Sequence, residues 1–66
     1  MSNLNQREIE ILKLIVDGCQ DLDIAKILTV NIQNIELRIE NILRKLRAKS
    51  KTEAVINAIK QSIIKP

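Results

Sequence analysis

The stretch DLDIAKILTVNIQNIELRIENILRKL, residues 21–46, decides the fold expected for this chain of 66 residues. Its second part carries apolar residues at offsets of four, seven and eleven, a spacing that places them on one helix face: Ile35, Ile39, Ile42 and Leu46. Its first part predicts a short helix over residues 22–28, and the segment TVN is a tight connection. A short helix, a turn and a longer helix over residues 32–45 form the helix-turn-helix layout.

The short helix over residues 22–28 has clear start signals. Asp21 is its expected N-cap, and Asp23 suits the positive N-terminal end of a helix. The apolar residues expected to point inward are Ile24, Ile27 and Leu28. Ala25 is small enough to let the short and the longer helix cross closely, and Asn31 can cap the longer one. These features strengthen the helix-turn-helix interpretation.

A further helix is predicted over about residues 6–17. It begins with a capping box of Asn5 and Glu8, in which each side chain bonds to the other residue's backbone amide. Gly18 can supply the left-handed residue that ends the helix. Its apolar stripe consists of Ile9, Leu12, Ile15 and Val16.

A fourth helix is predicted over about residues 51–63. Ser50 and Glu53 have the spacing of a second capping box at its start. Four helices joined by short connections leave no room for a sheet. We therefore expect a single all-α domain over residues 1–66, a four-helix helix-turn-helix domain.

The composition limits the class of protein. The chain has no Trp, Tyr or Phe, and its length is near the lower limit for a core that is stable alone, so association with a second copy would help. The lone Cys19 cannot form an internal disulfide, which favours a reducing compartment, and a small buried thiol is its simplest role. The apolar runs are short, and nothing resembles a signal peptide. We expect a cytoplasmic protein.

The net charge of +3 is unevenly distributed along the chain. Residues 1–43 hold four basic and seven acidic residues, whereas residues 44–66 hold seven basic residues and one acidic residue, Glu53. The densest basic run is RKLRAKSK, residues 44–51. Such a run is often only a solvated surface, and it also suits an edge that faces DNA phosphates.

Three segments together resemble the LuxR-type, or GerE-like, helix-turn-helix domain. LNQREIEILKLIVDG (residues 4–18) is similar to that family's opening, DIAKIL (residues 23–28) to its second helix, and NILRKLRAKSKTEAVINAI (residues 41–59) to its C-terminal part. The resemblance covers about residues 4–64 and rests on the order and spacing of the segments. It implies a domain that binds DNA, dimerises through its fourth helix and usually ends a larger regulator. This chain would then be that output domain standing alone, without a receiver or ligand-sensing part.

The chain departs from the family pattern on the surface that the family presents to DNA. Glu36 stands at the lysine position of the third helix, and Leu37 occupies an often polar position. The segment QDL (residues 20–22) replaces a usual Ser-Asn-Lys, and Arg47 stands where a glycine is typical. Carboxylates that face phosphates add repulsion, so we expect weak DNA binding by a single copy.

The first functional hypothesis is a DNA-binding transcriptional regulator that acts as a homodimer on a two-part site. Gln33 and Asn34 could read adenine edges or hold phosphates, and Arg38 could reach guanine or the backbone. Lys49 and Lys51 match the family's basic loop beside the DNA backbone. Double-stranded DNA is the expected partner of these five residues.

The fourth helix is the expected dimer interface. Val55 and Ala58 fit a face turned toward the first helix. A second apolar stripe, at offsets of three and seven, is more than one small domain can easily bury: Ile56, Ile59 and Ile63. The other interpretation is that the helix sinks deeper into its own domain.

The alternative functional hypothesis is a protein-interaction module that derives from a helix-turn-helix and has lost DNA binding. Its evidence is a set of apolar and acidic residues on the expected outer side of the second and third helices: Leu22, Ile32, Glu36, Leu37 and Glu40. Clustered exposed apolar residues on a small domain indicate an interface. The partner would be another regulator or part of the transcription machinery.

Enzymatic and membrane functions find no support in the sequence. The chain has no His or Tyr, Cys19 lacks an evident base, and no motif spaces the carboxylates around a cleft. We therefore expect no enzymatic activity, no cofactor and no metal site. The basic C-terminal part has no aromatic residue that could anchor it at a membrane surface.

Overall fold

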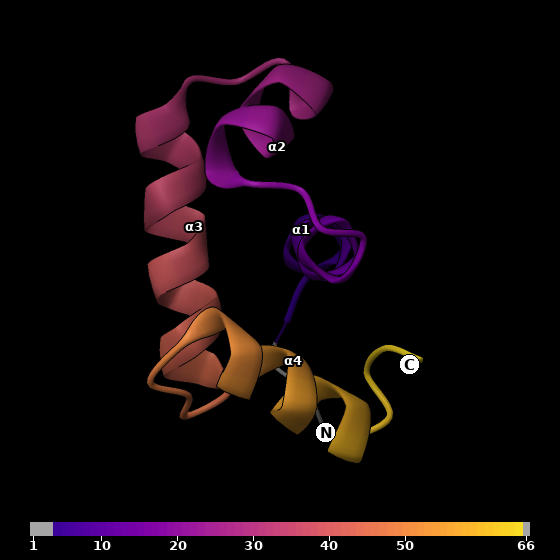
Figure 1. Ribbon diagram of the computed structural model, residues 1–66. Coiled ribbons are helices and arrows are strands. Elements are labelled where there is room, and N and C mark those ends of the chain that lie inside the picture. Colours follow the sequence, from indigo (N-terminus) through magenta and orange to yellow (C-terminus); the bar gives the residue numbers. More distant parts are fainter. Residues whose placement is uncertain (1–3, 66) are drawn as a thin grey trace.

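The computed structural model describes residues 4–65, which form four α-helices: α1 (Gln6–Val16), α2 (Asp21–Leu28), α3 (Ile32–Lys45) and α4 (Lys51–Lys60). In Figure 1, α1 is seen end-on near the centre, with α2 above it, α4 below it and α3 along one side. No strand occurs within residues 4–65, so the predicted all-α class is confirmed. α2, the turn after it and α3 are the predicted helix-turn-helix.

Aliphatic side chains from all four helices fill the core. The predicted stripe of α3 and its C-cap is confirmed, because all four of its residues are buried: Ile35, Ile39, Ile42 and Leu46. The other buried apolar residues come from α1, α2, α4 and the segment after α4: Ile11, Leu12, Ile24, Ala25, Ala54, Ala58 and Ile64. Full burial of one large aliphatic side chain contributes roughly 1.5–3 kcal/mol, so this cluster is the main source of stability.

The buried face of α1 differs from the predicted one. Ile11 and Leu12 are fully buried, whereas Val16 is exposed, and Ile9 and Ile15 are half buried. α1 packs against both α3 and α4. Its inward face is therefore rotated toward Ile11, which the predicted stripe omitted. The helix ends at Val16, one residue earlier than expected.

Side-chain caps begin α1 and α3 as the sequence indicates. Asn5 Oδ1 accepts from the Glu8 amide at 2.8 Å, and Glu8 Oε1 accepts from the Asn5 amide at 2.9 Å, which completes the predicted capping box. At the start of α3, Asn31 Oδ1 accepts from the Asn34 amide at 2.9 Å. Both caps satisfy backbone donors that have no partner within their helix.

The start of α2 corrects the prediction. The N-cap is Gln20, and its amide donates to the Asp23 carboxylate at 3.1 Å. Asp21 is therefore the first helical residue and not the cap, which leaves its carboxylate available for a distant partner. Ile27 was expected inside but is exposed, because α2 packs on α3 through the face that carries the buried Ala25.

The four helices of the described part end in the same backbone motif. In each, one residue has a positive φ, and the following amide donates to a carbonyl five residues earlier, as in a Schellman motif. The left-handed residues are Gly18 (φ 92°), Thr29 (φ 58°), Arg47 (φ 53°) and Ser62 (φ 59°). The donating amides are those of Cys19, Val30, Ala48 and Ile63, with N···O distances of 2.8–3.0 Å. Three of these ends hold a side chain where glycine is favoured.

This motif shortens α4 relative to the prediction. The helix ends at Lys60 and not near residue 63, because Ser62 takes the left-handed conformation. Ile63 therefore lies beyond the helix, and the expected stripe at offsets of three and seven does not continue to it. At the start of α4, Ser50 Oγ accepts from the Glu53 amide at 3.1 Å. The Glu53 carboxylate, however, accepts from the Lys49 amide at 3.3 Å, so the expected box is only half formed.

Two long-range contacts fix the position of the C-terminal end of α3. Asn57 Nδ2 donates to the Leu46 carbonyl at 2.9 Å, which joins α4 to that end. Lys45 Nζ lies 2.9 and 3.0 Å from the two carboxylate oxygens of Glu8, which joins α3 to α1. Within residues 4–65, none of the helices is long and apolar enough to cross a membrane.

Candidate nucleic-acid interface

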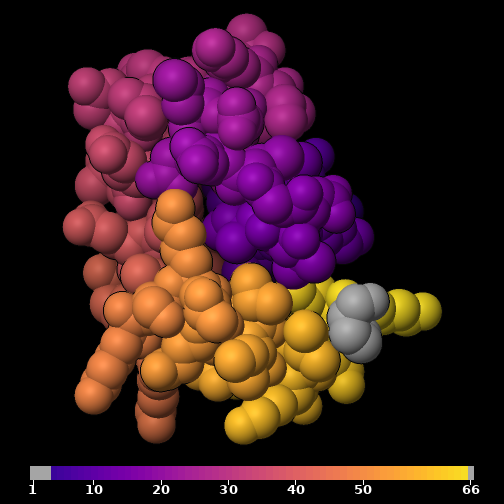
Figure 2. Space-filling view, viewed as in Figure 1, coloured from indigo at the N-terminus to yellow at the C-terminus, as the bar shows by residue number. Residues whose placement is uncertain are grey.

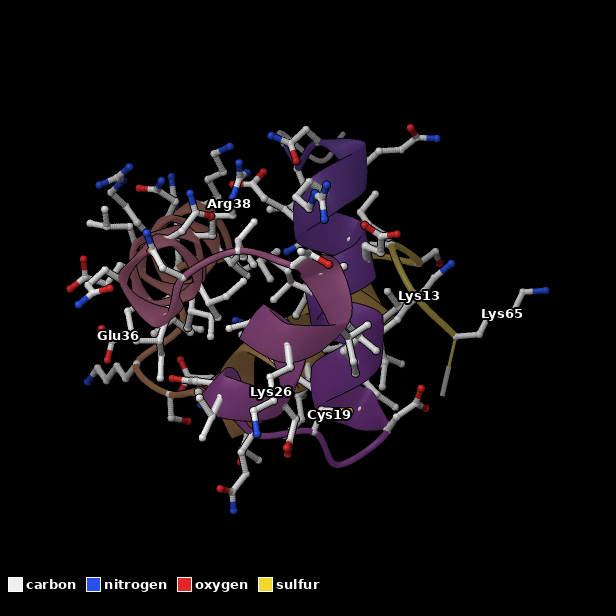
Figure 3. All side chains as sticks on the ribbon, turned by 90° about the horizontal axis from the view of Figure 1, so that it is seen from above. Lys13, Cys19, Lys26, Glu36, Arg38 and Lys65 are labelled. Atoms are coloured by element: carbon white, nitrogen blue, oxygen red, sulfur yellow. The ribbon has the colours of Figure 1, made fainter. Side chains whose placement is uncertain are left out.

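The outer side of α3 has two edges with different chemistry. In Figure 3, Glu36 and Arg38 leave α3 on different sides of the helix. We call the edge formed by Asn34 and Arg38 the polar edge. The other edge belongs to a shallow depression, which we call the acidic hollow; it is lined by Asp21 of α2 and by Gln33, Glu36, Leu37, Ile39 and Glu40 of α3.

The polar edge presents hydrogen-bond donors. Arg38 Nε donates to Asn34 Oδ1 at 2.9 Å, so one of the two lone pairs of that amide oxygen is used within the protein. Reading adenine with both groups of an amide needs a free acceptor as well as a donor. The arrangement therefore favours contacts of Asn34 and Arg38 with acceptors, such as phosphate oxygens or the guanine edge. The hydrogen bond from Arg38 therefore makes adenine recognition by Asn34 less favourable than the sequence predicted.

The acidic hollow brings together part of the alternative protein-binding face. Glu36, Leu37 and Glu40 line it, and the Leu37 side chain is 61% exposed. Leu22 is 53% exposed on α2 but is not among the lining residues. Ile32 is half buried and packs against the core. Only three of the five residues of this face therefore share one depression.

The basic segment, residues 44–51, runs from the last turn of α3 to the first residue of α4. It lies at the end of α3 that is opposite the N-cap. Figure 2 shows its side chains, in orange, projecting from the lower edge of the molecule. Lys49 is exposed, and Lys51 is the first residue of α4. Lys51 Nζ forms an ion pair with Asp21 Oδ1, so the start of α4 contacts the start of α2. No local sequence pattern predicts this contact, because its partners are 30 residues apart.

A second ion pair anchors the last turn of α3. Glu8 is buried, with 3% of its surface exposed, and Lys45 donates to both of its carboxylate oxygens. Burial alone raises the pKa of the Glu8 carboxyl. Hydrogen bonds from Lys45 and the Asn5 amide, with the positive charges of Lys45 and Arg38, outweigh burial and hold the pKa below its usual value. Within the basic segment, Lys45 therefore has a structural role, because it joins α3 to α1 through Glu8.

The helix-turn-helix geometry agrees with a comparison with known proteins. Residues 2–58 match the family described as bacterial regulatory proteins of the luxR family. The chain belongs to the luxR family. It is 38% identical over 61 residues to the response regulator protein VraR of Staphylococcus aureus, and equally to VraR of Staphylococcus saprophyticus and Staphylococcus epidermidis. The match covers 92% of this luxR-family chain but only 29% of the length of each relative.

The expected dimer residues of this luxR-family domain lie in different environments. Ile56 is 46% exposed on α4, whereas Ile59 and Ile63 are half buried against the core. Ile56 and Val55 line a mostly apolar depression between α4 and the end of α1, together with Ile15, Val16, Lys51 and Thr52. The exposed apolar surface near α4 is therefore centred on Ile56 and extends toward Val16.

Metal-ligating side chains do not cluster within residues 4–65. No group of three or more His, Cys, Asp or Glu residues lies close enough there to hold a metal ion. Cys19 is half buried, rather than fully buried as the simplest expectation had it, and packs against the core.

Proposed function

We propose that this luxR-family domain binds double-stranded DNA as a transcription regulator and acts as a homodimer. The observation that carries the proposal is the open outer side of α3, the second helix of the helix-turn-helix, in a chain of this family. In helix-turn-helix proteins this helix enters the major groove. The proposed DNA contacts are Gln33, Asn34, Arg38, Lys49 and Lys51.

The proposed contacts divide into two roles. Lys49 and Lys51 contact phosphates at the C-terminal end of α3, which contributes affinity without sequence selectivity. Arg38, braced by Asn34, contacts guanine or a phosphate with its guanidinium group, and Gln33 faces the bases from the first turn of α3. Because Glu36 and Glu40 stand on the same helix, we expect modest affinity from one copy. A dimer would double the number of contacts.

The salt dependence of binding to a random-sequence duplex tests DNA binding. Fluorescence anisotropy between about 50 and 200 mM salt should show affinity that falls steeply with salt. Lys49→Ala and Arg38→Ala should each lower the slope of log K against log salt by nearly one.

Lys13→Ala is the matched control for this titration. Lys13 is exposed on α1, and Figure 3 places it on the side of α1 away from α3. Its removal changes the net charge by the same amount and should alter the slope little. Equal losses for Lys13→Ala and Lys49→Ala would remove the basic segment from the proposed interface.

The dimer is tested by sedimentation. We propose α4 as the interface, with Ile56 at its centre and Ile59 and Ile63 beside it, because Ile56 exposes an apolar side chain next to Val16. Ile56→Lys should yield a monomer. Ile27→Lys, an equivalent change at an exposed isoleucine of α2, should leave the dimer intact. A dimer that withstands Ile56→Lys would exclude this interface.

The acidic hollow supports a second candidate function, in which the domain binds another regulator or part of the transcription machinery. Leu37 and Leu22 are exposed, and Glu36 and Glu40 lie beside Leu37. Exposed apolar residues within a polar rim are typical of protein interfaces. Absence of duplex binding at about 50 mM salt, where phosphate contacts are strong, would favour this function over DNA binding.

A further inference from the structure

Asp21 forms an ion pair with Lys51, which is one of the two lysines in the proposed DNA interface. Its Oδ1 atom pairs with Lys51 Nζ, between the first residue of α2 and the first residue of α4. The Asp21 side chain is 27% exposed and that of Lys51 is 43% exposed. The Asp21 side chain is therefore the more buried partner, and the Lys51 side chain has more surface open to a ligand.

The surroundings of Asp21 favour its negative charge. Asp21 begins α2, where the partial positive charge of the helix end stabilises a carboxylate. It also lines the acidic hollow with Glu36 and Glu40. A DNA phosphate that approaches Lys51 from this side meets three carboxylates, of which one already occupies the ammonium group.

We infer that Asp21 sets the DNA affinity of the domain by competing with a DNA phosphate for Lys51. The inference rests on the proposed function. A phosphate that contacts Lys51 must displace a carboxylate of the same chain, so this lysine contributes less to binding than a solvated lysine does. An asparagine at position 21 would remove the competing charge and leave the ammonium group to the phosphate.

A double-mutant cycle on the whole chain tests the inference. The proteins are the unchanged chain, Asp21→Asn, Lys51→Ala and the double variant, each shown by circular dichroism to be folded and each titrated with a random-sequence duplex. Asp21→Asn should bind about three- to tenfold more tightly at about 50 mM salt, with a salt slope steeper by up to about 0.9. In the Lys51→Ala background the gain should shrink to the general effect of removing one negative charge.

Asp23→Asn measures that general effect. Asp23 lies on the same helix, carries the same charge, and an asparagine there can still accept the hydrogen bond from the Gln20 amide. A gain for Asp21→Asn that equals the gain for Asp23→Asn, or that persists in full without Lys51, would overturn the inference and leave the proposed function standing. If none of the proteins binds duplex at about 50 mM salt, the proposed function fails, and the inference fails with it.

A measurement without DNA tests whether the ion pair of Asp21 and Lys51 forms in solution, independently of its effect on DNA affinity. The lysine ammonium groups can be observed by ¹⁵N–¹H nuclear magnetic resonance, and Lys51→Arg assigns the Lys51 signal. Asp21→Asn should shift that signal, whereas Asp23→Asn should not. An unshifted Lys51 signal would show that the pair is not formed in solution and would overturn the inference whatever the titrations give.

Discussion

Four apolar residues on the buried side of α3 and its C-cap repeat at the helical period, whereas the outer side mixes amides, carboxylates, an arginine and an exposed leucine. Packing constrains the buried side, because a change of volume leaves a cavity or an overlap. The outer side is constrained only by what it binds. A carboxylate such as Glu36 can therefore stand on the outer side, and the fold is still that of the luxR family. In this helix the residues that determine the fold and those proposed to bind DNA are therefore separate.

The largest expected effect comes from the buried side. Ile39→Ala should lower the free energy of unfolding by about 2–5 kcal/mol, because the truncation leaves a cavity in the core. Ile39→Val should cost about 0.5–1.5 kcal/mol and keeps the measurement possible if the alanine variant does not fold. The neighbouring Glu40→Ala, on the outer side, should change stability by less than about 0.5 kcal/mol. Chemical denaturation that gives the reverse ranking would contradict the assignment of the two sides.

The ion pair of Glu8 and Lys45 sharpens the comparison, since its Glu8 partner is charged and yet buried. Glu8→Gln should cost about 1–3 kcal/mol at neutral pH, because the Lys45 ammonium group loses its carboxylate partner. Glu10→Gln removes the same charge from an exposed position of α1 and is the control.

The pH dependence of the same pair has a definite sign. The pKa of Glu8 in the folded chain lies below its usual value of 4.5, so the pair contributes full stability above that pH. This contribution is lost as the pH falls through the lowered pKa. Thermal unfolding between neutral and acidic pH should therefore show a smaller acid-induced loss for Glu8→Gln than for the unchanged chain. Equal losses would mean that other carboxylates control the acid transition.

The outer side is tested by its effect on binding. Glu36→Lys places a positive charge where a negative one faces the proposed duplex, so affinity for a random sequence should rise about five- to tenfold at about 50 mM salt. The salt slope should steepen by nearly one, while the free energy of unfolding changes by less than about 0.5 kcal/mol. Glu10→Lys serves as the control for net charge. Unchanged affinity for Glu36→Lys would remove this edge of α3 from the DNA interface.

The smallest effect concerns the end of α3, where an exposed residue should nevertheless change stability. Arg47 has a φ of 53°, a conformation that an L-residue adopts at a cost of about 1–2 kcal/mol. Arg47→Gly should raise the free energy of unfolding by about 0.5–1 kcal/mol, after the larger entropy loss of glycine is deducted.

Gly18→Ala supplies the reciprocal control for Arg47→Gly. Gly18 has a φ of 92°, and an added Cβ would meet no atom within 4 Å, so only backbone strain is introduced. We expect a loss of about 1 kcal/mol in chemical denaturation. A loss for Arg47→Gly instead of a gain would show that the arginine side chain makes a compensating contact.

Sequence rules succeeded where the decisive residues are three or four positions apart. The capping box of Asn5 and Glu8, the asparagine cap of α3 and the buried stripe of α3 are all of this kind. The rules failed at the end of α4, because Ser62 takes a conformation that the sequence pattern assigns to glycine. They failed again on α2, where Ile24 and Ala25 are buried but Ile27 is exposed.

For the candidate site, the sequence predicted which residues face outward but not how they pair. The outer position of Gln33, Glu36, Leu37 and Glu40 follows from the buried stripe on the opposite side of α3. Lys45 contacts Glu8, which is 37 residues away, and Lys51 contacts Asp21, which is 30 residues away. No local sequence pattern predicts either contact. The roles of the individual residues in DNA binding and dimerisation stay predictions.

The uneven distribution of charge makes this domain an electric dipole that can turn in the field of a nucleic acid. Residues 44–66 carry an excess of six positive charges and residues 1–43 an excess of three negative ones. The longest dimension of 29 Å is more than three times the Debye length of about 8 Å at physiological ionic strength. At physiological ionic strength a nearby duplex therefore attracts residues 44–66 and repels residues 1–43. The resulting torque orients the domain before contact. At about 0.01 M salt the Debye length is about 30 Å, and the net charge of +3 governs the approach from any direction.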